Sequence, residues 1–124
     1  VTAIRHYDGS AITYRDLNRR ANMLANELIN TFGLKTGDRV VLVYSRCIEM
    51  VVFILAVLKA GGQYVPLDGG IVTEDTLGFD IADSNAPVVL CLPKFLDKVM
   101  RSIPNDRRKE YNVPIDCLSI PWMN

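Results

Sequence analysis

The sequence has no excess of charge of either sign. Fourteen basic residues stand against 14 acidic ones in a chain of 124, and the net charge is zero. A protein that binds nucleic acid needs a clear basic patch or stripe. The basic cluster 107–109 lies between Asp106 and Glu110, which is typical of a solvated surface segment. We therefore expect no nucleic-acid partner.

Cysteine and histidine are also scarce. Cys47, Cys91 and Cys117 are far apart, lie among apolar neighbours and form no CxxC pair. This pattern is typical of buried free thiols in a reducing compartment, and we expect a cytoplasmic protein. His6 is the single histidine and has no cysteine beside it, so we expect it to hold no metal and to have no catalytic role.

The chain lacks a hydrophobic run of membrane-spanning length. Met50 to Leu58 are nine consecutive apolar residues, whereas a bilayer-spanning helix needs roughly 20. We expect a helix that is buried on nearly all sides and no membrane partner. No signal peptide opens the chain, and the first residue is Val rather than Met. The second of these features suggests an excised or processed fragment.

Strand and helix signals alternate along most of the chain. Alternation of this kind predicts an α/β fold with a parallel sheet of about four strands and helices on both faces, since βαβ crossovers are right-handed. We expect a short N-terminal β-hairpin before the sheet, and we expect residues 1–124 to be a single domain or a single piece of a larger one. The expected strands are 2–6, 11–13, 39–44, 63–67, 86–92 and 114–120, and the expected helices are 13–32, 46–60, 73–84 and 93–103, with a polar loop over 105–112.

Gly61 and Gly62 follow a helix and precede a strand in "LKAGGQYVPLD". A phosphate-binding loop has the opposite order, because the N–H groups of a following helix must face the anion. Gly61 is therefore expected to end the helix with a positive φ, and Gly62 to let the chain reverse. Gly69 and Gly70 do lie between a strand and a helix, but without a phosphate-binding motif around them they predict only a flexible loop.

No catalytic constellation emerges from the remaining polar residues. The serines lack a GxSxG context, and a single histidine makes a triad hard to build. Asp80 and Asp83 lie three apart on a short helix and are typical of a solvated face. We assign no catalytic, cofactor-binding or metal-binding residue to this chain.

Two stretches carry a family resemblance. "ITYRDLNRRANMLANEL" resembles the first core motif of the AMP-forming adenylating enzymes, with Asp16 in place of the usual Glu. "LKAGGQYVPLD" resembles the second core motif of the nonribosomal peptide synthetase branch, with Gln63 in place of a small residue. The resemblance extends from about Ala3 to Ile120 and implies the N-terminal subdomain of an adenylation domain. After Asp68, two prolines and an arginine of the family pattern are missing from "GGIVTEDTL", although Glu74 aligns.

The resemblance implies an activity for a longer parent protein, in which ATP and a carboxylic acid give acyl-AMP and pyrophosphate. In the family, the ATP-phosphate loop, the adenine and acid pockets and the catalytic lysine all follow the region seen here. The parent would use ATP and Mg, whereas this fragment is expected to bind no cofactor and to be inactive. Its expected partners are the remainder of the adenylation domain or a second copy.

Two other interpretations remain open. One is a stand-alone half-domain that acts as a protein-interaction module. The other is an independent nucleotide-binding domain, which the absence of a phosphate loop disfavours.

Overall fold

The structure is a computed structural model, and it describes residues 2–5, 11–45 and 48–110. The strands are β1 (Thr2–Arg5), β2 (Ala11–Thr13), β3 (Arg39–Tyr44), β4 (Gln63–Asp68) and β5 (Val88–Cys91). The helices are α1 (Tyr14–Asn30), α2 (Ile48–Lys59), α3 (Glu74–Ser84) and α4 (Leu96–Ser102), together with the 3₁₀ turns η1 (Pro93–Phe95) and η2 (Asn105–Glu110).

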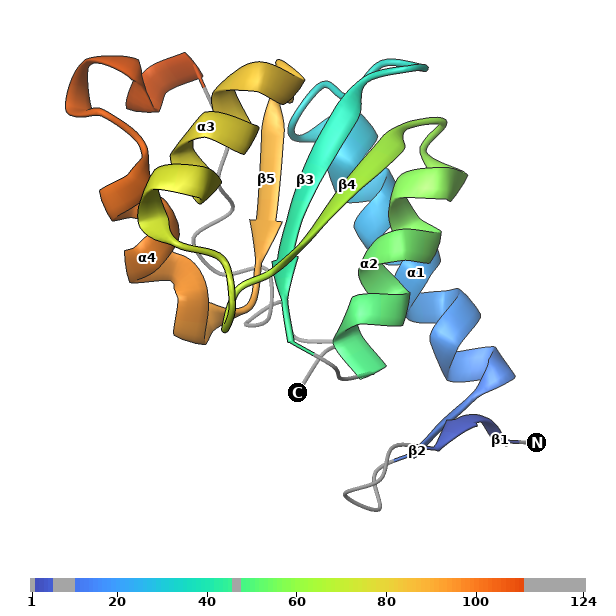
Figure 1. Cartoon of the computed structure of the whole chain (residues 1–124). Coiled ribbons are helices and arrows are strands. Elements are labelled where there is room, and N and C mark those ends of the chain that lie inside the picture. Colours follow the sequence, from blue (N-terminus) through green and yellow to red (C-terminus); the bar gives the residue numbers. More distant parts are fainter. Residues whose placement is uncertain (1, 6–10, 46–47, 111–124) are drawn as a thin grey trace.

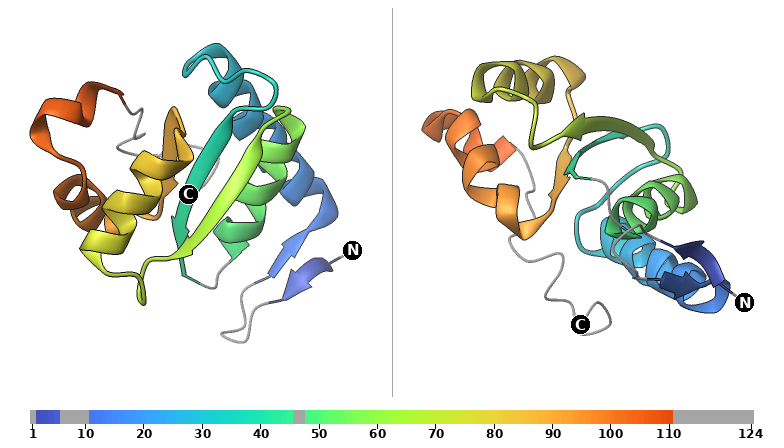
Figure 2. Two further views of the ribbon diagram at one scale, coloured as in Figure 1. Left: turned by 45° about the horizontal axis from the view of Figure 1, so that its top comes forward. Right: turned by 60° about the horizontal axis from the view of Figure 1, so that its bottom comes forward.

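The main sheet has the order β4-β3-β5, and both pairings are parallel. Helices α1 and α2 cover one face of this sheet, and α3 and α4 cover the other (Figures 1 and 2). β1 and β2 form a separate antiparallel hairpin at the start of α1. The predicted fold class is confirmed, and the predicted strand 114–120 lies outside the described residues.

The sequence signals explain where the helices begin. Thr13 caps α1, and its hydroxyl oxygen accepts a hydrogen bond from the Asp16 N–H at 3.2 Å. Thr73 caps α3 in the same way through the N–H of Thr76. The buried positions of α1 recur at helical spacing, and they are Leu17, Ala21, Leu24, Ala25 and Leu28.

The structure differs from the sequence prediction at η1 and at η2. Pro93 opens a 3₁₀ turn, so α4 begins only at Leu96. Residues Asn105–Glu110, expected as an irregular loop, form the 3₁₀ turn η2, in which the N–H of Arg107 donates to the carbonyl of Pro104. The helix expected from residue 46 is described from Ile48 onward, and residues 46 and 47 lie outside the described part.

The glycine pair turns the corner between α2 and β4, as predicted. Gly61 has a φ of +81°. Its N–H donates to the carbonyl of Leu58 at 3.1 Å, and the N–H of Gly62 donates to that of Val57 at 2.9 Å. These are the two bonds of a Schellman motif, which ends a helix through a residue of positive φ.

The corner also joins the starts of two neighbouring strands. The N–H of Gly37 donates to the carbonyl of Gly61, and the N–H of Gln63 donates to that of Asp38, both at 2.8 Å. A Cβ on Gly62 would lie 3.0 Å from the carbonyl oxygen of Asp38. The glycines therefore allow two turns at the amino ends of β3 and β4 to pack against each other.

Pro66 lies in the middle of β4, and the hydrogen-bond pattern explains why the strand tolerates it. The N–H of Gln63 donates to Asp38 and that of Gly69 donates to Tyr44, so the odd-numbered residues face β3. Pro66 faces away from β3, where it removes the central donor from the strand's outer edge. Proline at such a position is typical of an edge strand and disfavours the addition of a further strand there.

The outer side of α2 is only partly covered. Residues Val52, Phe53, Ala56 and Val57 are fully buried against the sheet and α1. On the opposite side of the helix, Val51, Ile54 and Leu55 are half-buried, and Leu58 is 53% exposed. The expected burial on nearly all sides is therefore incomplete. None of the helices in the described residues has the length and hydrophobicity to cross a membrane.

The substitution Gly61→Val tests the corner. A β-branched residue at φ +81° is strained, and its Cβ would also lie 3.2 Å from Thr36 Oγ1. We expect a loss of about 1 kcal/mol or more in the free energy of unfolding, measured by chemical denaturation. Gly70→Val is the control, because Gly70 has no positive φ and a Cβ there makes only an ordinary contact with Asp68. Equal stability of both variants would contradict the role of Gly61.

Candidate functional site at the carboxyl edge of the sheet

The carboxyl ends of parallel strands are where open α/β sheets usually bind ligands, at a point where neighbouring strands lead to opposite faces. β3 leads to α2 on one face, while β4 and β5 lead to α3 and α4 on the other. The end of β3 at Tyr44 therefore meets the topological condition for a ligand crevice.

Phe95 occupies this position. It packs against the buried residues on both faces of the sheet. A Cβ on Gly69 would lie 2.6 to 2.7 Å from three atoms of the Phe95 ring, so the loop after β4 approaches the ring as closely as only glycine permits. The side chain closes the edge between β4 and α4 with apolar contacts.

The loop after β4 is organised by Asp68. Its carboxylate Oδ1 accepts a hydrogen bond from the N–H of Gly70 at 2.9 Å. Its backbone carbonyl accepts from the N–H groups of Ile71 and Val72 at 3.1 and 2.9 Å. With the bond from the Gly69 N–H to Tyr44, each of the four amides from 69 to 72 has a backbone or carboxylate partner. The loop was expected to be flexible, but its backbone is closely bonded.

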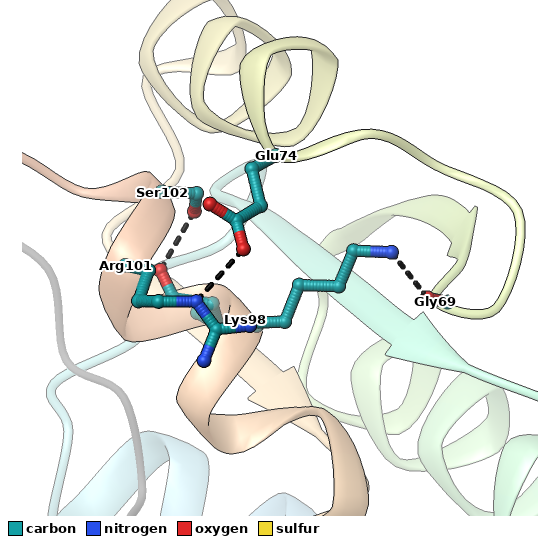
Figure 3. A network of polar contacts seen from close by, with 6 residues as sticks. Gly69, Glu74, Lys98, Arg101 and Ser102 are labelled. Atoms are coloured by element: carbon teal, nitrogen blue, oxygen red, sulfur yellow. Dashed lines mark hydrogen bonds and ion pairs between the residues drawn. The ribbon is translucent and has the colours of Figure 1, made fainter.

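Two cationic side chains of α4 reach this loop and the start of α3 (Figure 3). Lys98 Nζ donates a hydrogen bond of 2.7 Å to the carbonyl of Gly69. Arg101 Nε donates to Glu74 Oε1, also at 2.7 Å. The Lys98 side chain is half-buried, whereas the side chains of Arg101 and Glu74 are 59% and 46% exposed. Of the two contacts, the lysine bond is therefore the better shielded from water.

A groove of about 270 Å³ runs beside these contacts, between α3, α4 and η2. A Cβ on Gly78 would lie 2.5 Å from the carbonyl oxygen of Ser102, so the two helices meet closely at the groove floor. The groove is lined by Glu74, Asp75, Gly78, Phe79, Ala82, Arg101, Ser102, Pro104 and Arg107. Its charges are mixed and open to solvent, an arrangement that gives no one ligand class a clear advantage.

Three residues that the sequence analysis considered as possible catalytic or metal-binding groups lie in ordinary structural environments. The hydroxyls of Ser84 and Ser102 donate to carbonyls of their own helices, and Cys91 is buried in β5. Within 2–5, 11–45 and 48–110, no three His, Cys, Asp or Glu side chains gather as metal ligands. His6, Cys47 and Cys117 lie outside the described residues.

Sequence reasoning missed Phe95, Lys98 and Arg101. Phe95 and Lys98 contact Gly69, and Arg101 contacts Glu74 at the start of α3. All three lie far along the chain from these partners, and no motif marks them. The one available signal for these contacts is that the 69–73 loop has two glycines and no proline. Such a loop has many unfolded conformations, so contacts from other elements are needed to order it.

Comparison with known proteins places the chain in a family. The family of AMP-binding enzymes matches residues 1–121. An adenylate-forming reductase of Coprinopsis cinerea is 41% identical over 99 residues, which is 80% of this chain and 10% of the reductase. Gramicidin S synthase 2 of Brevibacillus brevis is 34% identical over 119 residues, 95% of this chain and 3% of the synthase. The solved structure of apo MatB from Rhodopseudomonas palustris has a TM-score of 0.76 at 32% identity, covering 91% of this chain and 22% of MatB.

The chain therefore belongs to the AMP-binding enzyme family of AMP-forming ligases. Its fold is that of the N-terminal part of an adenylation domain, as the two sequence motifs predicted. The chain spans at most 22% of the length of these relatives.

The contact between Gly69 and Phe95 predicts the effect of Gly69→Ala. The new methyl group would overlap the ring, so Phe95 or the loop must move. We expect a destabilisation of about 1 to 3 kcal/mol, typical of overpacking, measured by chemical denaturation.

The double variant Gly69→Ala with Phe95→Leu is the control, because the shorter side chain removes the ring from the contact. The double variant should lose less free energy of unfolding than the two single variants lose together. Strict additivity, or a Gly69→Ala variant as stable as the parent chain, would contradict the close approach.

Proposed function

We propose that the chain is the structural N-terminal portion of an ATP-dependent, peptide-synthetase-like ligase that activates a carboxylic or amino acid. In that reaction the acid's carboxylate attacks the α-phosphorus of ATP, the bond between the α- and β-phosphates breaks, and acyl-AMP and pyrophosphate form. The names of the relatives support this proposal, since they include a gramicidin synthase and an adenylate-forming reductase. We assign no step of the reaction to the described residues.

The scaffold role rests on one observation: both family motifs form structural features of the fold. The first supplies the Thr13 cap and the buried face of α1. The second supplies the Gly61 corner and the edge strand with Pro66. Both motifs shape the fold, and the end of β3, where a ligand crevice would form, is closed by Phe95.

The described residues do not fit a site for ATP with Mg²⁺. The glycines of the second motif follow the carboxyl end of α2, which carries partial negative charge and repels phosphate. The N–H groups of Gly70, Ile71 and Val72, which precede α3, already bind Asp68. We therefore propose that ATP and Mg²⁺ bind to other parts of the enzyme, and that this chain alone binds neither.

The scaffold proposal predicts that purified 1–124 catalyses no ATP–pyrophosphate exchange with any proteinogenic amino acid. A heat-treated sample gives the background, and a known adenylation enzyme confirms that the assay works. Exchange above background that depends on one acid would overturn the proposal.

A second candidate is a stand-alone half-domain that acts as a protein-interaction module. The exposed Leu58 on the outer side of α2 favours the interaction module, because exposed apolar surface often marks a site where another protein binds. The reading frame separates the candidates. Translation beyond Asn124 into a Ser/Thr/Gly-rich loop ending in Pro-Lys-Gly supports the ligase, and a stop codon there supports the module.

Under either candidate we propose that the outer side of α2 is covered, by the remainder of the domain or, in the isolated chain, by a second copy. The half-buried row Val51, Ile54 and Leu55 continues to the exposed Leu58 at helical spacing. Pro66 disfavours the alternative of pairing through the β4 edge.

The isolated chain is accordingly expected to form a two-fold dimer at micromolar concentration, measured by light scattering. Leu58→Glu should shift it to monomer, because a charge would be buried in the contact. Phe79→Ser, which removes an even more exposed apolar side chain from α3, should leave the dimer intact. A monomer without dye-binding apolar surface would contradict self-association.

A further inference from the structure

We propose that Lys98 is the positioning residue of a latch that holds the 69–73 loop against α4 and so keeps the carboxyl edge of the sheet closed. The inference concerns the conformation of this chain and does not depend on the ligase activity.

The loop needs a restraint of this kind because of its composition. Residues 69–73 read Gly-Gly-Ile-Val-Thr, and a segment with two glycines and no proline has many unfolded conformations to lose on ordering. Asp68 binds the loop's amides from within the same turn. Such local bonds fix the shape of the turn, but they leave its orientation to contacts with other elements.

Lys98 supplies the tie to a distant element. Its Nζ donates to the carbonyl of Gly69, immediately after β4 ends. A hydrogen bond from an ammonium group is charge-assisted and stronger than a neutral one. No ion pair of the described residues includes Lys98, so its charge is directed to this carbonyl.

Phe95 and Lys98 lie one helical turn apart, on η1 and α4. The ring packs against Gly69 while the ammonium group holds the same residue's carbonyl. A movement of α4 away from the loop would therefore release both contacts together. Opening would uncover the ring at the end of β3, where the topology places a ligand crevice.

The Arg101–Glu74 pair supports the latch less strongly. Both side chains are about half exposed, and ion pairs of this kind contribute little because water and salt screen them. The half-buried lysine is therefore the residue whose loss should free the loop. The loop also carries Ile71, which is 80% exposed, so the latch fixes the direction of a prominent apolar side chain.

Hydrogen exchange of the whole chain tests the latch. In Lys98→Met, the amides of residues 69–73 should exchange roughly tenfold faster, because a charge-assisted bond is lost. Lys98→Arg, which retains a cationic donor, should restore part of the protection. Lys94→Met is the matched control, since Lys94 Nζ lies over the Phe95 ring, 5.1 Å from its centroid, whereas the hydrogen bond to the Gly69 carbonyl comes from Lys98. It should leave exchange at 69–73 unchanged.

Three outcomes would overturn the latch. In the first, exchange at 69–73 is the same in Lys98→Met and Lys94→Met. In the second, exchange in Lys98→Met rises equally in β3, α1 and the loop, which would mean global destabilisation. In the third, Lys98→Arg exchanges as fast as Lys98→Met, because the protection would then not come from the cationic hydrogen bond.

Discussion

The burial of β3 between two parallel neighbours is the constraint on which the rest of the structure depends. Residues Val40 to Val43 have no exposed surface, and alternate side chains enter the two halves of the core. A strand buried on both faces needs hydrogen-bonding strands on both sides and helices above and below it, since no water can satisfy its backbone. β4, β5 and the four α-helices meet these requirements.

The two ends of this sheet are closed by different means. At the amino end, Gly61 and Gly62 allow the turns before β3 and β4 to pack backbone against backbone. At the carboxyl end, the Phe95 ring and the Lys98 ammonium group act from another element. The first arrangement is built into a family motif. The second involves the 69–73 loop, which contains two glycines and no proline and is restrained by tertiary contacts.

This division bears on function. In an α/β protein the carboxyl edge is where chemistry usually occurs, and the amino edge usually serves stability. The first family motif lies in β2 and α1, and the second runs from the amino-edge corner along β4 to Asp68 at the carboxyl edge. Within both motifs the described contacts cap helices, turn the chain or order a loop, which agrees with the proposed role of a scaffold. The carboxyl edge offers an ordered loop and a mixed-charge groove between α3 and α4.

The sequence by itself determined the elements and their order, because these follow from local chemistry. Thr13 and Thr73 cap helices, valine-rich runs make buried strands, and a helix–glycine–strand order requires a corner with a positive φ at Gly61. It also determined the family, through motifs that such local constraints keep recognisable. Boundaries at η1 and η2 were missed, since one 3₁₀ turn differs little from a loop or a first helical turn in its sequence pattern.

Only the tertiary structure decided what happens at the carboxyl edge. Gly69 and Gly70 read as a flexible loop, and nothing in their neighbourhood indicates that Lys98 and Phe95 restrain them. Likewise, the sequence shows Pro66 only as a residue of the second motif. Its position on the outer edge of the sheet follows from the pairing of β4 with β3. Contacts between residues distant in sequence depend on how helices and strands pack, and no local pattern of residues encodes which side chains will then meet.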